Sequence, residues 1–452
     1  IEIPASVTSL GYALFYDCSS LKTVIFEDGS KLTTIPGYDW NGVGGPFRAC
    51  YALEKVVLPE TITNIEFRAF QNCSALREIN IPQSVVRIGD YAFVGCKKME
   101  GVINLPKCQS IGAGAFSSCE AITGMQLSDN CTVIGQSAFS GCKSMETINL
   151  SFAQTRIESS TFQNCLSLKQ IKLPQYLSFI GSYAFSGCET LTSIDIPSTV
   201  TTLSDRIFFG CTGLISVSIA SSVETIGDYA FSGCSGMTTL QIEEGVETIG
   251  NYAFQNCTGL TSVSIPSSVQ TLGSSAFSGC TGLTSVSIPS SVETIGSYVF
   301  SNCSGITSFV LPNGIKTIPN GIFSGCTGLS SISIPSSVET IGSSAFSGCS
   351  GITSLQIAEG VKAIDRSSFY NCFGLTELVI PSSIESIGQE AFRYCNSLKS
   401  IISWPTIPPS GGNNMFYSTN NCLIYVPSAS VEAYKTATYW SSYANRIQAI
   451  QE

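Results

Sequence analysis

Cysteine is the residue type in this chain that most invites a chemical role. The 452-residue sequence contains 20 cysteines and no histidine. Without histidine there can be no Ser-His-Asp triad, no Cys-His pair and no histidine-ligated metal. Zinc sites built from cysteine need close pairs such as C-x-x-C, and no two cysteines stand that close here. We therefore expect neither a metal nor a cofactor.

Carboxylate pairs are the remaining common catalytic device, but the acidic residues follow a structural pattern. One position that recurs every 23 residues holds Glu224, Glu247, Gln270, Glu293, Lys316, Glu339, Lys362 and Glu385. The signs alternate from the fourth member onward, which favours a surface ion ladder worth about 0 to 1 kcal/mol per pair. The Gly-Lys dipeptide of a Walker loop is also absent. We expect a protein that is not an enzyme.

A repeat of 23 residues positions all of these side chains, and it is clearest in residues 260–282 and 283–305. Its landmark is a phenylalanine three residues before a cysteine. From Phe47 to Phe392 the step is always 23 residues, whereas Phe15 stands 32 residues before Phe47. Counting these landmarks gives about seventeen turns of a repeat protein.

Each turn predicts one short strand. Leu260, Val263 and Ile265 follow the leucine-rich-repeat spacing L-x-x-L-x-L, with polar residues between them. A proline then ends the strand. A second apolar cluster follows, made of Val269, Leu272, Ala276, Phe277 and Cys280. Because one turn cannot bury these side chains alone, neighbouring turns must cover it. The sequence predicts a leucine-rich repeat solenoid with a parallel strand ladder, mostly β and irregular.

Seventeen of the cysteines occupy the single column that follows the phenylalanine. Stacked side chains in a parallel ladder lie ~4.8 Å apart, which is wider than the ~3.8 Å between Cβ atoms in a disulfide. Each cysteine would also have two identical neighbours. We interpret the column as buried free thiols that act as small apolar side chains. Cys108 and Cys131 are again 23 residues apart and are expected to form a second short column of the same kind.

The domain organisation follows from where the repeat holds. Residues 1–400 are predicted to form the solenoid, with an insertion near residues 36–46, and residues 401–452 to form a degenerate last turn and a C-terminal cap. A solenoid must seal its last exposed core, and this segment is rich in proline, tyrosine and tryptophan.

Inside that segment we expect two elements. Leu423 to Val426 is predicted to be the final strand. Residues 428–436 have helical spacing, with Ser428 or Ser430 as the N-cap and with Val431 and Tyr434 on one face.

The repeat phrases resemble those of a known family. Residues 288–300 (IPSSVETIGSYVF) and 278–285 (SGCTGLTS) are similar to the BspA-type leucine-rich repeats of bacterial and protozoan surface proteins. Residues 423–450 also resemble the closing segment of its gut-bacterial members. The resemblance implies secretion, display on the cell surface, and adhesion to host or microbial partners. It implies no catalytic residues.

Charge and hydropathy limit the partners. The formal net charge is −10 and the pI is about 4.7, which argues against nucleic acid and anionic membranes. No apolar run approaches the ~20 residues of a membrane span. Residue 1 matches the inside of a strand, so we expect a trimmed mature fragment. Together with the resemblance, this leaves extracellular proteins or glycans of the host or of microbes as the expected partners.

Two places are candidate binding sites. The outward positions of the strands form two columns of small polar side chains, represented by Ser262, Ser264, Ser285 and Ser287. The alternative is that this is only a soluble face. The insertion contains Tyr38, Asp39 and Trp40 in a glycine-rich loop, and exposed aromatic side chains often anchor ligands. The alternative here is that Trp40 folds back over the core.

The sequence therefore favours a non-enzymatic extracellular or cell-surface scaffold that binds proteins or mediates adhesion. One alternative is a passive spacer that projects another domain. Another is a glycan-binding module, for which saccharide binding would be lost when Tyr38 or Trp40 is changed to alanine.

Overall fold

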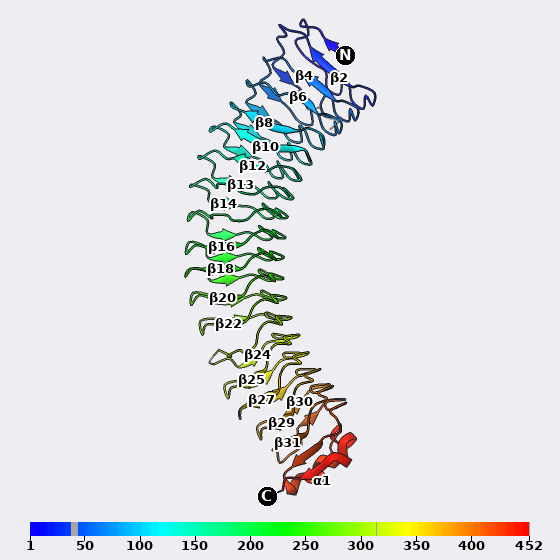
Figure 1. Ribbon diagram of the computed structural model, residues 1–452, viewed down its shortest axis with the longest axis vertical. Helices are drawn as coiled ribbons and strands as arrows, with labels where there is room; N and C mark the ends of the chain where they lie inside the picture. The colour runs from blue at the N-terminus through cyan, green and yellow to red at the C-terminus, as the bar shows by residue number, and fades with distance from the viewer. Residues whose placement is uncertain (38–43, 313, 452) are drawn as a thin grey trace. The chain divides into compact units, whose positions relative to one another are not determined.

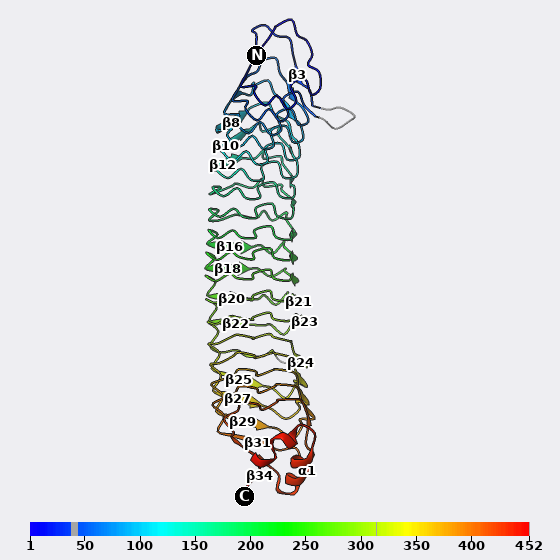
Figure 2. The ribbon, with the colours of Figure 1, turned by 90° about the vertical axis from the view of Figure 1, so that its right-hand side faces the viewer.

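The chain folds as a parallel-strand β-solenoid of about 19 turns (Figure 1). The computed structural model describes residues 1–37, 44–312 and 314–451. It comprises two compact units, the first formed by Ile1–Val223 and Gly233–Ser235 and the second by Glu224–Ser232 and Gly236–Glu452. In each unit most turns carry a strand on one side, here called the first face, and a two-residue strand on another, the second face (Figure 2).

The first unit has strands on both faces. Its first-face strands are β1 (Glu2–Ile3), β2 (Thr23–Phe26), β4 (Lys55–Val57), β6 (Glu78–Asn80), β8 (Gly101–Leu105), β10 (Ile122–Leu127), β12 (Thr147–Asn149) and β16 (Ser216–Ile219). Its second-face strands are β3 (Thr34–Ile35), β5 (Asn64–Ile65), β7 (Arg87–Ile88), β9 (Ser110–Ile111), β11 (Val133–Ile134), β13 (Arg156–Ile157), β14 (Phe179–Ile180) and β15 (Thr202–Leu203).

The second unit repeats this arrangement. Its first-face strands are β18 (Thr239–Ile242), β20 (Ser262–Ser264), β22 (Ser285–Ser287), β25 (Ser331–Ile334), β27 (Ser354–Ile357), β29 (Glu377–Ile380), β31 (Ser400–Ser403), β33 (Leu423–Val426) and β34 (Ile447–Ala449). Its second-face strands are β17 (Thr225–Ile226), β19 (Thr248–Ile249), β21 (Thr271–Leu272), β23 (Thr294–Ile295), β24 (Thr317–Ile318), β26 (Thr340–Ile341), β28 (Ala363–Ile364), β30 (Ser386–Ile387) and β32 (Ser410–Gly411). Three short helices lie between β33 and β34, namely η1 (Ser428–Ser430), α1 (Val431–Thr436) and η2 (Trp440–Arg446).

The first-face strands confirm the predicted alternation. In β20 the middle residue, Val263, is buried while Ser262 and Ser264 are exposed. β20 pairs in parallel with β22, so that Ser262 lies beside Ser285 and Ser264 beside Ser287. Alternation arises because successive side chains of a strand point to opposite sides.

The second-face strands were not predicted. The pair Thr271 and Leu272 is too short to give an alternating pattern, and only stacking of β21 on β19 makes it a strand. The structure confirms the burial of the second apolar cluster, since Val269, Leu272 and Phe277 are fully buried.

Phenylalanine rings form a continuous stack inside each unit. From Phe15 to Phe208 in the first unit, successive ring centroids lie 5.2 to 5.9 Å apart. From Phe231 to Phe416 in the second unit they lie 5.2 to 5.8 Å apart. Offset ring pairs of this kind contribute about 0.5 to 1.5 kcal/mol beyond burial. Phe416 extends the stack by one turn beyond Phe392, although it follows after 24 residues and lacks the paired cysteine.

The cysteine column consists of free thiols, as expected, but these thiols also donate hydrogen bonds. The Sγ of Cys280 donates to the carbonyl oxygen of Phe254, in the preceding turn, over 3.1 Å. The equivalent bonds lie between 3.0 and 3.3 Å in both units. A cysteine thus joins neighbouring turns, which an alanine or valine of similar size would not do. Cys18, in the first turn, is exposed rather than buried.

Left-handed backbone conformations shape the turn that contains each phenylalanine. Asn72, Asn256 and Asn302, the residues directly before the column cysteines, have φ near +60°, a region that asparagine tolerates well. Glycine at another position has a different role. A Cβ on Gly273 would lie 2.4 Å from the backbone of Gly250 in the neighbouring turn. This glycine permits close approach of two turns.

The C-terminal cap is present and closes the apolar core of the second unit. Trp440 and Tyr443 pack on Phe416, with ring centroids 5.6 and 5.7 Å away. The indole N–H of Trp440 donates to the carbonyl oxygen of Pro409 over 2.8 Å. Arg446 is buried and its Nε donates to the carbonyl oxygen of Cys422 over 2.8 Å. The cap therefore satisfies the polar groups of the last turn as well as covering its rings.

Two details of the cap correct the sequence predictions. β33 has the predicted bounds, but it is not the final strand, because β34 pairs in parallel with it after the helices. Ser430 occupies the N-cap position of α1 without a capping hydrogen bond. Its Oγ donates instead to the carbonyl oxygen of Thr406 over 2.7 Å. A tertiary contact thus takes the place of the capping hydrogen bond.

Burial predicts the reactivity of the thiols. We expect 5,5′-dithiobis(2-nitrobenzoate) to label only the exposed Cys18 in the native protein and all 20 cysteines in denaturant. The measurement is the absorbance released in each condition. The variant Cys18→Ser should abolish the native signal, and rapid native labelling of several thiols would contradict the buried column.

Burial also predicts a pH dependence. Desolvation raises the pKa of the Cys165 thiol to about 12, from 9.0 for a free thiol, and Cys211 behaves in the same way. Between these pH values the unfolded chain binds fewer protons than the folded chain, so the free energy of unfolding falls as pH rises. Stability should be intact below pH 9 and decline toward pH 12, measured as the midpoint of the urea transition that unfolds the turns around Cys165. Cys165→Val should reduce the dependence of the unfolding free energy on pH by the equivalent of about one proton, and Cys18→Ser should leave it unchanged.

The cap predicts a local loss of stability. Trp440→Ala removes a fully buried ring and should destabilise the last turns by about 3 to 5 kcal/mol. Hydrogen exchange of the β31 and β33 amides measures this, because long repeat arrays do not unfold in one step. Trp404→Ala, at a side chain 47% exposed, is the control and should change protection by about 0.5 kcal/mol or less. Equal effects of both variants would contradict the role of the cap.

Candidate functional site

The structure brings four of the predicted site residues together. Ser262 and Ser264 of β20 and Ser285 and Ser287 of β22 are exposed on the first face, in register across one strand pair. Among the described residues, none of their hydroxyl groups makes a hydrogen bond. These hydroxyls remain available to an external donor or acceptor.

A neighbouring column of hydroxyl groups is used by the fold. The Oγ1 of Thr284 donates to the carbonyl oxygen of Thr261 over 3.2 Å, and the Oγ of Ser330 donates to the carbonyl oxygen of Thr307 over 3.2 Å. These bonds join one turn to the next at the start of the first-face strand. Hydroxyl groups that bond to the preceding turn are thus only one residue away from hydroxyl groups that are available to a ligand.

Serines after the first-face strands are also structural. The Oγ of Ser268 donates to the carbonyl oxygen of Val246 over 2.8 Å. Ser267 and Ser268 both contact the carboxylate of Glu244, with bonds of 2.9 to 3.1 Å. These backbone and hydroxyl donors hold the pKa of Glu244 below its usual range. The serines that follow this first-face strand therefore stabilise the contact with the preceding turn.

The first face of the first unit carries two polar grooves that sequence reasoning missed. One of about 600 Å³ is lined by Asn104, Gln126 and Asn149. Another of about 430 Å³ is lined by Gln170, Lys172, Ser193 and Asp195. The second groove lies where residues 169–173 and 192–196 form no strand. The repeat pattern gives no signal for this loss, because the apolar spacing of both turns is intact.

The predicted ion ladder forms ion pairs in the middle of its column. The carboxylate of Glu339 lies 2.9 Å from the Nζ of Lys362 and 3.3 Å from the Nζ of Lys316. The hydrogen bond from Lys362, followed by that from Lys316, lowers the pKa of Glu339. All three side chains are largely exposed, so the ladder contributes to register and solubility.

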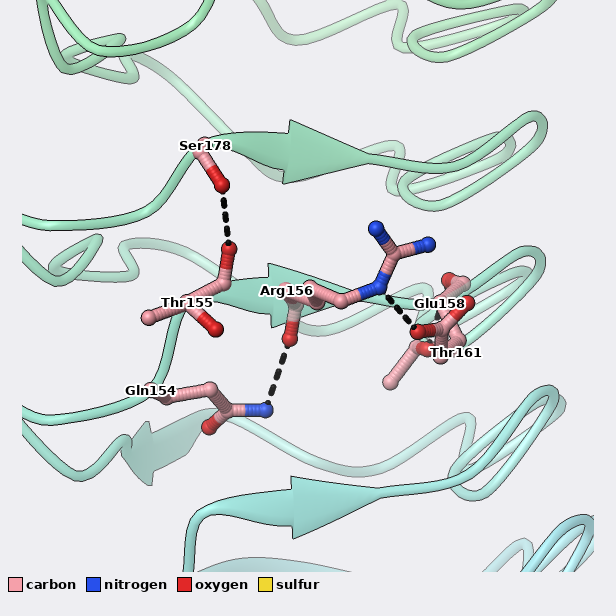
Figure 3. A network of polar contacts seen from close by, with 6 residues as sticks. All are labelled: Gln154, Thr155, Arg156, Glu158, Thr161 and Ser178. Atoms are coloured by element: carbon pink, nitrogen blue, oxygen red, sulfur yellow. Dashed lines mark hydrogen bonds and ion pairs between the residues drawn. The ribbon is translucent and has the colours of Figure 1, made fainter.

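One turn of the first unit contains a polar network in place of the usual apolar residue (Figure 3). Gln154 is buried where neighbouring turns have cysteine or leucine, and its Nε2 donates to the carbonyl oxygen of Arg156 over 2.9 Å. The Nε of Arg156 donates to Glu158 over 2.8 Å, and its guanidinium lies 4.0 Å from the ring centre of Phe179. The Oε1 of Gln154 is buried and has no partner among the described residues, but the other contacts lie within one turn or join it to the next, and they indicate a structural role.

The other candidate residues, Tyr38, Asp39 and Trp40, lie outside the described residues. Within residues 1–37, 44–312 and 314–451, no cluster of three or more cysteines and carboxylates could hold a metal ion. In the same ranges, no helix is long and apolar enough to cross a membrane. What β20 and β22 offer chemically on the first face is hydrogen bonding by uncharged hydroxyl groups in register.

A family model matches nearly the whole chain. Six copies of the BspA type leucine rich repeat region match residues 1–42, 45–169, 155–281, 208–330, 247–373 and 316–446. No curated protein sequence matches the chain.

Several solved structures are similar. A leucine-rich repeat protein from Bacteroides ovatus is 27% identical, covers 93% of this chain and 88% of its own, and has a TM-score of 0.43. A leucine rich cell surface protein from Faecalibacterium prausnitzii is 24% identical, with coverage of 77% and 87% and a TM-score of 0.47. A leucine-rich repeat protein from Eubacterium ventriosum is 22% identical, with coverage of 74% and 83% and a TM-score of 0.43.

Proposed function

This chain belongs to the BspA-type leucine-rich repeat family, and from that premise we propose that it is an extracellular adhesion scaffold that binds proteins through its first face. Proteins of this repeat type are in general protein-binding scaffolds without catalytic residues. The family resemblance further implies secretion and display at a microbial surface. The proposed partners are extracellular proteins or glycans of the host or of other microbes.

The observation that carries this proposal is the division of hydroxyl groups on the first face. Thr284 is bonded to the preceding turn, whereas Ser285 and Ser287 are exposed and have no partner among the described residues. A face needed only for solubility would be expected to carry more charge. Only 12% of the residues are charged, and small uncharged donors and acceptors suit close contact with another protein backbone.

Repetition suits this mode of binding. The exposed serines recur in β25 and β27, where Ser331 lies beside Ser354. Each contact of this kind is weak, but contacts on linked turns raise the effective concentration of the next. A partner with a repetitive or extended surface would therefore gain most from this grid.

The test is equilibrium binding of the purified chain to extracellular-matrix proteins, mucins and glycans at physiological salt. We expect saturable binding to at least one partner and a loss of at least tenfold in the double variant Ser264→Arg and Ser287→Arg, because two long cations would block the grid. The control is Thr258→Arg with Thr281→Arg, which adds the same charge at exposed positions outside β20 and β22.

Each outcome of this experiment is informative. Binding that both double variants weaken equally would contradict the first face as the site. Binding to none of the partners would favour the passive spacer. Saccharide binding lost in Tyr38→Ala and Trp40→Ala, and unaffected by the serine variants, would favour the glycan-binding module.

A further inference from the structure

The second face of the second unit contains a break between two successive turns. β23 pairs with β21 on one side of the break, and β24 pairs with β26 on the other; Figure 2 labels both edge strands. Among the described residues, no backbone hydrogen bond joins residues 293–295 to residues 316–318. The ladder therefore stops at β23 and starts again at β24.

Pro319 gives this break a cause in the sequence. The equivalent residue one turn later is Gly342, whose N–H donates to the carbonyl oxygen of Ile318 over 3.0 Å. Proline has no N–H group, so Pro319 cannot make this bond to Ile295. At this break the donor itself is missing, whereas at the breaks between β11 and β13 and between β14 and β15 the equivalent residues, Glu158 and Ser204, have an N–H group.

The separation opens a groove of about 730 Å³. Val292, Ile295 and Ile315 line it and are partly exposed. Their counterparts in a closed part of the stack, Val338 and Ile341, are 0% exposed. The groove thus uncovers core side chains, and its volume lies within the range of about 300 to 1,000 Å³ that is usual for ligand pockets.

Polar groups at the groove are left without the partners that the rest of the stack supplies. Elsewhere, Glu339 and Thr340 donate their N–H groups to the carbonyl oxygen of Lys316, but nothing equivalent reaches the carbonyl oxygen of Glu293 among the described residues. One wall therefore presents carbonyl acceptors and the other presents amide donors.

The charges at the groove are also unbalanced. Lys316 also lines the groove, and its ammonium group lies 3.3 Å from the carboxylate of Glu339 in the following turn. Within the described residues Glu293, which lines the groove, has no ion-pair partner. The wall formed by β23 consequently favours a cation.

We propose that this groove binds an extended peptide segment of a partner protein, which lies as an added parallel strand between β23 and β24. Its backbone donates to the carbonyl groups of one wall and accepts from the amides of the other, the mode known as β-strand addition. An aliphatic or aromatic side chain packs against Val292, Ile295 and Ile315, and a lysine or arginine of the segment pairs with Glu293. A small apolar ligand would leave the backbone groups of both walls unpaired, so it fits less well.

This site does not rest on the function proposed above. The groove lies on the second face, whereas the serine columns lie on the first, and the two are disabled by different substitutions. Loss of serine-dependent binding would leave the peptide site intact, and loss of peptide binding would leave the serine face intact.

The test uses an array of alternating hexapeptides. Apolar positions hold valine, isoleucine, leucine or phenylalanine, and the positions between them hold lysine, arginine, glutamate or serine. We expect the native protein to bind members with lysine or arginine at least tenfold more tightly than those with glutamate. On binding, hydrogen exchange of the Lys316 and Thr317 amides should slow.

Two variants locate the site. Pro319→Gly restores the missing N–H, lets the turns close and should weaken binding at least tenfold. Glu293→Gln should weaken the lysine and arginine members about tenfold and leave the serine members unchanged. The matched control is Glu247→Gln, in the same column of a closed turn, and it should have no effect.

Several outcomes would overturn the proposal. These are equal binding of native protein and Pro319→Gly, absence of binding by every peptide, and equal loss in the Glu293 and Glu247 variants. Tight binding of the dye 8-anilinonaphthalene-1-sulfonate, with no peptide able to displace it, would assign the groove to small apolar ligands instead.

Discussion

Contact between successive turns is the interaction on which each unit depends, because one turn of 23 residues cannot bury its own apolar side chains. The backbone carbonyl group of each stacked phenylalanine is one place where successive turns are joined. The carbonyl oxygen of Phe254 accepts the N–H of Cys257 from its own turn and the thiol of Cys280 from the next. Both acceptor sites of a buried carbonyl are thereby satisfied. This explains why the column is made of cysteine, a small apolar residue that can also donate, and why the rings stack without interruption in each unit.

The second-face ladder is interrupted in both units. Gln154 sits in an apolar position, and the strand of its turn, β13, pairs with β14 but not with β11 of the preceding turn. The ladder is interrupted again beside Pro319. At Pro319 the missing N–H removes a backbone bond that would connect the two turns along that edge.

The abundance of serine and threonine has two separate meanings. At the start of the first-face strands and at the following corner, hydroxyl groups bond to the carbonyl oxygens of the preceding turn, as Thr284 and Ser268 do. In the two outward columns between them, hydroxyl groups such as that of Ser285 are exposed. The same residue types therefore support stacking in one column and stay exposed in another, within a few residues of one another. The low charge of the chain follows, because charged side chains in these columns would repel their identical neighbours one turn away.

The sequence by itself determined the repeat, the parallel ladder, the inward residues such as Val263 and Phe277, the free thiols and the C-terminal cap, because all of these follow from periodicity and from the need to cover a repeated apolar pattern. It located the exposed serines for the same reason. Only the tertiary structure decided the second-face strands, the thiol donors, the additional strand β34 and the groove beside Pro319. Each of these depends on which atoms of one turn meet those of the next, and a pattern of residue types records the spacing of side chains but not the pairing of backbone groups between turns.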